Sequence, residues 1–263
     1  MMTKFSTTAI TLIMTAALAA CSSGSGGGSA TTPPPSTNPD TPNNPGTPNN
    51  PAPANPASNA VADLVAFAEG GTKSTRAGGV AEYDRTAADG RRVTARLMDG
   101  TKSGFVKVAQ DGRITRYDLA GSPVVNADTP GGVFTGDFEV SYAMGASQPV
   151  QQARGDGFIE LDMASGQAYL ESGVSNAANN IFVLGEMDYA NGRLTGNDMH
   201  VQVRDGEGNI DLNGNGRSDD DVWGDFGKAE GILVDNANGT SIIGVLEGQH
   251  ESGFRMDGGF VVD

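Results

Sequence analysis

Apolar and polar residues alternate along the second half of the chain, most regularly over residues 133–142. One face of this stretch carries the large apolar residues Phe134, Phe138, Val140 and Tyr142. The other face carries Thr135, Asp137, Glu139 and Ser141. Because the side chains of a strand point to alternate faces, this pattern predicts a strand with one buried face and one face exposed to solvent.

Similar strand patterns return in seven further stretches of this half. They lie at residues 157–163, 167–172, 181–188, 193–204, 228–235, 240–248 and 254–262. Short turns rich in Gly, Asn and Ser, such as Asn191-Gly192, join most of them and are typical of antiparallel hairpins. Eight consecutive antiparallel strands predict an up-and-down β-barrel, because closure removes exposed sheet edges. A two-sheet sandwich is the alternative.

Four shorter strand patterns precede the predicted barrel. They lie at residues 79–84, 92–98, 104–108 and 114–119, with Asp-Gly turns at Asp89, Asp99 and Asp111. Successive Asp-Gly turns are typical of a β-meander. Residues 60–69 predict one short helix, so the expected fold class is all-β: a short antiparallel meander followed by an eight-stranded antiparallel barrel.

Residues 22–59 have a different composition and carry ten of the thirteen prolines. No apolar residue larger than alanine occurs there, so the segment cannot bury enough surface to offset its chain entropy. We expect a disordered tether over residues 21–59, with polyproline character in its second half.

The first twenty residues have the pattern of a bacterial export signal. Lys4 is followed by an apolar stretch from Ala9 to Ala20, and about twelve residues are too few to span a bilayer, which needs about twenty. The sequence Leu18-Ala19-Ala20-Cys21 resembles the lipobox that lipoprotein signal peptidase cleaves. The resemblance implies diacylglycerol on the Cys21 thiol and acylation (palmitate or a related chain) of the amine that cleavage frees. An ordinary signal peptide with a chance cysteine is the alternative. Cys21 is the single cysteine, so lipidation also explains an otherwise odd thiol.

Charge divides the remaining chain. Residues 60–128 carry similar numbers of basic and acidic residues, whereas residues 129–263 are strongly acidic, which predicts a boundary near Asp128. The net charge of −15 argues against nucleic acid as a partner, because nucleic-acid binding needs clustered Lys and Arg.

The lipobox-like cysteine, the Gly/Ser/Pro-rich tether, and the small meander followed by an eight-stranded barrel resemble one known group of proteins. This group is the surface lipoproteins that have a transferrin-binding protein B-like β-barrel, which include the factor H binding proteins. Residues 239–248 (Gly-Thr-Ser-Ile-Ile-Gly-Val-Leu-Glu-Gly) and 253–260 (Gly-Phe-Arg-Met-Asp-Gly-Gly-Phe) look like the last barrel strands of that family. The resemblance covers about residues 75–263 and implies a non-enzymatic binding surface displayed outside the cell. The chain has one barrel rather than doubled lobes and no alignable ligand-contacting motif, so the resemblance assigns no binding residues.

One segment between the fifth and sixth predicted barrel strands resembles the first nine positions of an EF-hand-type calcium loop. Its candidate ligands are Asp211, Asn213, Asn215, the backbone carbonyl of Arg217, Asp219 and Asp221. Val222 stands where a bidentate Glu is expected, so Asp220 or Asp221 would have to substitute. We expect a structural Ca²⁺ that stabilises this loop. The alternative is an Asn/Gly/Asp-rich loop that is solvated and binds no ion.

The sequence predicts no enzyme and no catalytic residues. The two histidines, His200 and His250, form no HExxH pair, and no G-x-S-x-G motif occurs. The first functional hypothesis is therefore an outer-membrane, lipid-anchored, monomeric protein that binds an extracellular protein or an iron or solute carrier and is displayed at the cell surface. The alternatives are a calcium-stabilised structural or adhesive envelope lipoprotein, and a hydrolase that joins a histidine to a nucleophile.

Overall fold

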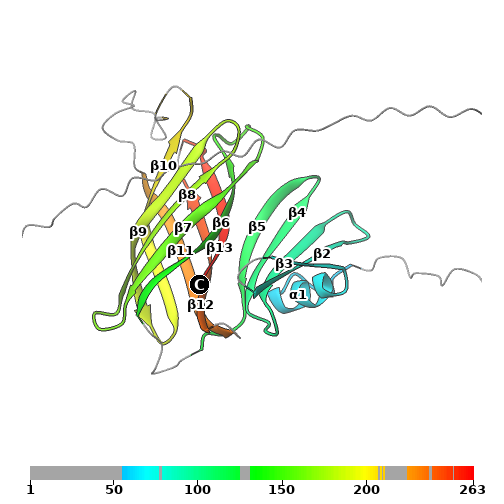
Figure 1. Cartoon of the computed structure of the whole chain (residues 1–263). Helices are drawn as coiled ribbons and strands as arrows, with labels where there is room; N and C mark the ends of the chain where they lie inside the picture. Colours follow the sequence, from blue (N-terminus) through cyan, green and yellow to red (C-terminus); the bar gives the residue numbers. More distant parts are fainter. Residues whose placement is uncertain are drawn as a thin grey trace, which may run out of the picture. The chain divides into compact units, whose positions relative to one another are not determined.

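The structure is a computed structural model that describes residues 55–76, 79–124, 131–206, 208, 210, 224–236, 239–250 and 252–263. In these residues one short helix precedes a five-stranded sheet, and a closed eight-stranded barrel follows (Figure 1). All strand pairs are antiparallel. The predicted all-β fold, with a meander followed by an up-and-down barrel, is confirmed.

The helix and the small sheet form the first layers. Helix α1 spans Val61–Glu69, and the strands are β1 (Thr72–Thr75), β2 (Val80–Thr86), β3 (Arg92–Met98), β4 (Gly104–Gln110) and β5 (Arg113–Ala120). They pair in chain order as a meander. Leu64, Phe67 and Ala68 of α1 pack on one face of the sheet, against apolar residues such as Val93 and Val106.

The barrel strands follow in chain order and close between the first and the last. They are β6 (Gly132–Ala143), β7 (Gln151–Asp162), β8 (Gln167–Ser175), β9 (Asn180–Ala190), β10 (Arg193–Arg204), β11 (Gly224–Asn236), β12 (Gly239–Gln249) and β13 (Arg255–Val262). Closure pairs β13 with β6 in a register that sets Phe260 opposite Phe138. Their rings stack with centroids 5.1 Å apart, which favours this register over a one-residue slip.

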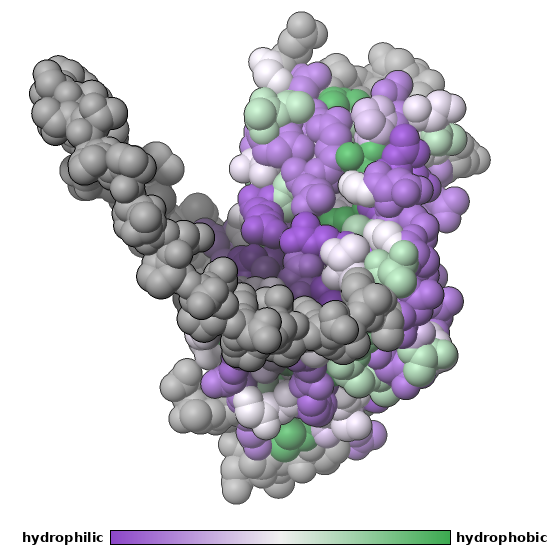
Figure 2. All heavy atoms as spheres, turned by 90° about the vertical axis from the view of Figure 1, so that its right-hand side faces the viewer, coloured by the Kyte–Doolittle hydropathy of each residue, from purple (hydrophilic) through white to green (hydrophobic). Residues whose placement is uncertain are grey.

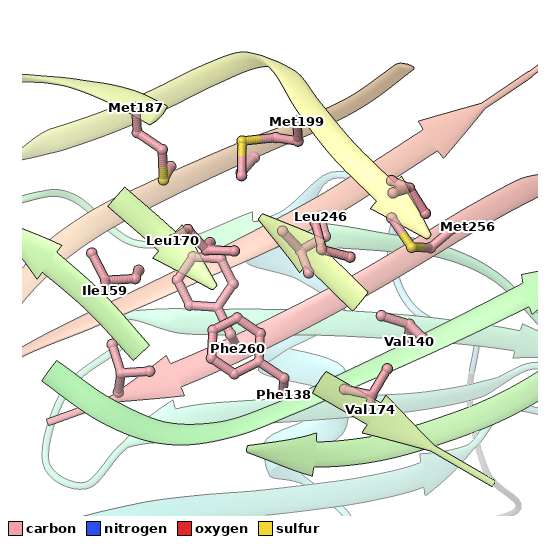
Figure 3. Packing of buried hydrophobic residues seen from close by; sticks show 14 of the residues in the cluster. Phe138, Val140, Ile159, Leu170, Val174, Met187, Met199, Leu246, Met256 and Phe260 are labelled. Atoms are coloured by element: carbon pink, nitrogen blue, oxygen red, sulfur yellow. The ribbon is translucent and has the colours of Figure 1, made fainter. Parts of the chain in front are cut away.

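The barrel interior is filled with apolar side chains from all eight strands. Figure 3 shows ten of them labelled, and they point toward one another: Phe138, Val140, Ile159, Leu170, Val174, Met187, Met199, Leu246, Met256 and Phe260. A small barrel has an interior just wide enough for its own side chains. The interior is therefore a packed core.

Two-residue turns set the register of two of the hairpins. Asn191 and Gly192 between β9 and β10 have φ values of 53° and 75°, and Asp111 and Gly112 between β4 and β5 have 50° and 74°. Positive φ at both central positions defines the type I′ turn, whose twist matches that of the strands. The Asn-Gly and Asp-Gly pairs predicted these hairpins for this reason.

The outward face of the barrel is polar over strands β7 to β9. Glu160, Asp162, Glu186 and Asp188 are all exposed. Hydrophilic residues also predominate on another side of the molecule, the right-hand side of Figure 1, which Figure 2 turns toward the viewer. Within the part of the chain described, no helix has both the length and the apolar character of a membrane span.

One prediction about the outer wall is wrong. Glu139 and Ser141 were expected in solvent, yet each is only 3% exposed. The cause is the small sheet, which covers this part of the barrel: Lys107 and Tyr117 of the sheet contact Glu139, and Tyr117 also contacts Ser141. Alternation along one strand cannot reveal that a second layer covers its polar face.

Strand β1 was not predicted. Its sequence, Thr-Lys-Ser-Thr, holds no apolar residue and all four side chains are exposed. It pairs with β2 at the edge of the sheet and buries nothing, so its sequence carries no alternation.

Gly244 gives a direct test of the packing inside the barrel. A Cβ at this position would overlap the Phe260 ring and the carbonyl oxygen of Glu230, whereas a Cβ at Gly173 would meet its nearest atom, in Phe182, at 3.4 Å. We expect Gly244→Ala to lower the free energy of unfolding by about 2 kcal/mol, because overpacking a full core costs about that much. Gly173→Ala is the matched control. Equal urea midpoints for the two variants would contradict the packing described.

Candidate functional site

The face of the small sheet turned toward the barrel has two chemically different ends. Alternation along β3 places Arg92, Thr94, Arg96 and Met98 on this face. Met98 belongs to the apolar patch that docks on the barrel, together with Phe105 of β4. Arg96 and Lys107 lie toward the other end, where the barrel presents polar residues of β6 and β7.

Glu139 of β6 is the centre of this polar end. Its Oε2 lies 2.7 Å from Arg96 Nη2 and 3.2 Å from Nη2 of Arg154 on the neighbouring barrel strand β7. Its Oε1 accepts a hydrogen bond of 3.0 Å from Lys107 Nζ. The Arg96 Nη2 contact is electrostatic, because this nitrogen lacks hydrogen-bond geometry. Three cations therefore surround one buried carboxylate.

A second carboxylate, that of Glu82 on β2, contacts the same arginine. Its Oε2 accepts hydrogen bonds from Arg96 Nε at 2.7 Å and from Arg76 Nε at 2.8 Å. Arg96 thus bridges Glu82 and Glu139, and its guanidinium also lies 5.5 Å from the centroid of the Phe105 ring. The planar guanidinium suits this role, since it offers several donors in fixed directions and can stack on an aromatic face.

The polar end of this face opens into a cleft of about 370 Å³. Its charged lining residues are Glu82, Asp84, Arg92, Lys107 and Arg154, and Thr94 and Gln152 add neutral polar groups. Arg92 forms a close ion pair with Asp84 across β2 and β3. The wall thus combines hydrogen-bond donors and acceptors.

The cations influence the protonation of their neighbours. Burial lowers the pKa of Lys107 below its ordinary value; Glu139 opposes this shift, while Arg96 and Arg154 add to it. Burial acts to raise the pKa of Glu82, but Arg96, Arg76 and Lys107 outweigh it and hold the pKa below its ordinary value. Burial also raises the pKa of Tyr117, beside Glu139. The cations hold Glu82 in its charged form.

A second cleft, which is acidic, lies between β5 of the sheet and strands β12 and β13 of the barrel. Asp257 of β13 stands opposite Glu247 of β12, and both line a cleft of about 280 Å³ with Asp118 of β5. Burial, followed by the charge of Glu247, raises the pKa of Asp257 to about 6; Arg255 opposes the shift and Asp118 adds to it. The two clefts therefore differ in the sign of their charge.

The sequence-predicted site residues lie outside the described residues. This holds for Cys21 and for the calcium-loop residues Asp211, Asn213, Asn215, Arg217, Asp219 and Asp221, which fall between the end of β10 and the start of β11. Lipidation and calcium binding stay predictions. Within the described ranges, no group of three or more His, Cys, Asp or Glu side chains is arranged to hold a metal ion.

The histidines lie on different elements. His200 is half-buried on β10 and lines a surface cleft with Glu186 and Asp198. His250 lies in the turn after β12, where its Nδ1 accepts the Ser252 backbone N–H at 3.2 Å and lies 2.9 Å from Ser252 Oγ. A ring nitrogen that accepts from its own turn stabilises that turn.

Sequence reasoning missed the cationic residues of the cleft. Residues 60–128 hold ten of the chain's seventeen Lys and Arg residues, but the charge distribution predicted only a domain boundary. The usable signal was positional: Arg92, Arg96 and Lys107 alternate with apolar residues on neighbouring strands, so their side chains share one face. Nothing in the sequence pointed to Glu139 as their partner.

Replacing Glu139 tests the charge network. Glu139→Gln leaves three cations close together without their carboxylate, and breaking a buried ion pair in this way costs about 3 kcal/mol or more. We expect urea unfolding to show a loss of that size. Glu160→Gln, an exposed position on β7, is the control and should change stability by less than about 0.5 kcal/mol. A similarly small change for Glu139→Gln would contradict the network.

Asp257 predicts a pH dependence. Because its folded-state pKa of about 6 exceeds the ordinary value of 3.8, the folded chain holds this proton more tightly than the unfolded chain. Its contribution to stability is full below pH 3.8 and is lost as the pH rises through about 6. Asp257→Asn should therefore be more stable than the parent at pH 7.5, with the difference shrinking toward pH 4. Unfolding in urea across this range measures it. A pH-independent difference would contradict the assignment.

Comparison with models of known protein families gives no match, and comparison with functionally characterised proteins gives none either. The function is therefore argued from the residues and the geometry of the chain.

Proposed function

We propose that this chain is an outer-membrane lipoprotein that displays a non-enzymatic β-barrel, and that the barrel with its attached sheet binds an extracellular protein or a solute carrier. The lipobox-like sequence ending in Cys21 supports the lipid anchor. The Pro-rich composition of residues 22–59 supports a tether between the anchor and the folded residues.

The observation that supports the binding role is the charged cleft on the outer surface of a barrel whose interior is filled. Side chains from every strand occupy its interior, so the lumen offers no space to a ligand of drug size. Recognition must then use the outer surface, where the cleft between the small sheet and strand β7 is lined by charged side chains of both signs. A binding module needs such a surface and no reacting group.

Cell fractionation and protease treatment of intact cells test the display. We expect the parent chain in the outer-membrane fraction and its barrel cleaved by external protease. Cys21→Ala should leave the membrane fractions, because several acyl chains supply the anchoring energy. Ser22→Asp is the matched control: by the bacterial sorting rules that the lipobox resemblance implies, it keeps the lipid but should hold the chain in the inner membrane.

Two results would overturn the proposal. One is membrane association that survives Cys21→Ala. The other is full protection of the parent chain from protease in intact cells, with cleavage after lysis.

A further inference from the structure

The cleft beside Glu139 holds more positive than negative charge. Four cations, Arg76, Arg96, Lys107 and Arg154, contact two carboxylates, Glu82 and Glu139. Arg92 and Asp84 form a further pair and offset each other. This local excess occurs in a chain whose net charge is −15, so the cleft stands apart from the rest of the surface.

Arg154 is the cation best placed to meet a ligand. It shares Glu139 with Arg96 and Lys107 and makes the longest of the three contacts, at 3.2 Å. Its side chain is 53% exposed, and it lines the cleft. A guanidinium has five N–H donors in a fork that fits a carboxylate or a phosphate with two parallel hydrogen bonds. One contact with Glu139 leaves most of this capacity for another anion.

The partly buried cations also repel one another. Arg96 and Arg154 both act to lower the pKa of Lys107, whose side chain is only 12% exposed. A negative ligand in the cleft would offset this repulsion, and in a partly dehydrated site the attraction is stronger than in water. Glu82, Gln152 and Thr94 can accept hydrogen bonds from hydroxyl groups on the same ligand.

We propose that this cleft binds a small organic polyanion, a molecule with two or more carboxylate or phosphate groups, and that Arg154 is its principal anchor. The proposal goes beyond the protein or carrier partner proposed above, because it adds a small-molecule ligand at this cleft. The volume of about 370 Å³ falls in the range of small-molecule sites and excludes a folded partner from the cleft itself.

Calorimetric titration of the full chain in detergent tests the proposal with two probes, citrate for the carboxylate class and fructose 1,6-bisphosphate for the phosphate class. Binding of either probe supports it, and the stronger probe identifies the class. Arg154→Gln should weaken binding by at least about tenfold, the loss of a charge-assisted contact. Arg154→Lys should lose less, since it keeps the charge but not the fork. Added salt should weaken binding in each case.

Arg193→Gln is the matched control, because it removes the same charge from an exposed position at the start of β10. It should leave the affinity within about twofold of the parent, as expected for a distant surface charge screened by salt. Circular dichroism verifies that each variant is folded. No binding of either probe at millimolar concentration, or equal losses in Arg154→Gln and Arg193→Gln, would overturn the proposal. Surface display by protease accessibility would stand in that event, so the two failures are distinguishable.

Discussion

A carboxylate buried in the wall of a protein must be paired, because removing an unpaired charge from water costs several kcal/mol. Glu139 is such a group, and its partners come from two parts of the fold: Arg96 and Lys107 from the small sheet, and Arg154 from the next barrel strand. This requirement joins the sheet to the barrel in one orientation. If the sheet moved away, Glu139 would lose two of these three cations.

The apolar patch and the charge network contribute differently to the docking of the sheet on the barrel. Met98 and Phe105 pack on Ile232 and Ile243, and burying such surface stabilises docking by about 25 cal/mol per Å² without fixing a direction. The ion pairs around Glu139 need defined distances and angles, so they set the orientation in which the patch is buried. The same pairs leave an excess of positive charge at the open end, where the cleft lies. Docking and candidate binding thus use the same residues.

Much of the fold could be predicted from sequence because it depends on local patterns. The bounds predicted for β3 and β10 agree with the structure, and Asn191-Gly192 and Asp111-Gly112 marked their hairpins. The candidate site could not be predicted in the same way. Glu139 lies on the polar face of a regular strand, and its burial depends on a separate sheet, whose Lys107 lies 32 residues away in sequence. Nothing local distinguishes it from Glu160, which is exposed.

A double-mutant cycle between Lys107 of the sheet and Glu139 of the barrel tests most directly whether these two parts meet as described. The cycle compares the free energies of unfolding in urea of the parent, Lys107→Met, Glu139→Gln and the double variant. Nζ and Oε1 lie 3.0 Å apart in a buried setting, so we expect a coupling energy of about 1 to 3 kcal/mol. A coupling energy near zero would mean that the two side chains do not meet, and it would contradict both the docking of the sheet and the cleft that the docking forms.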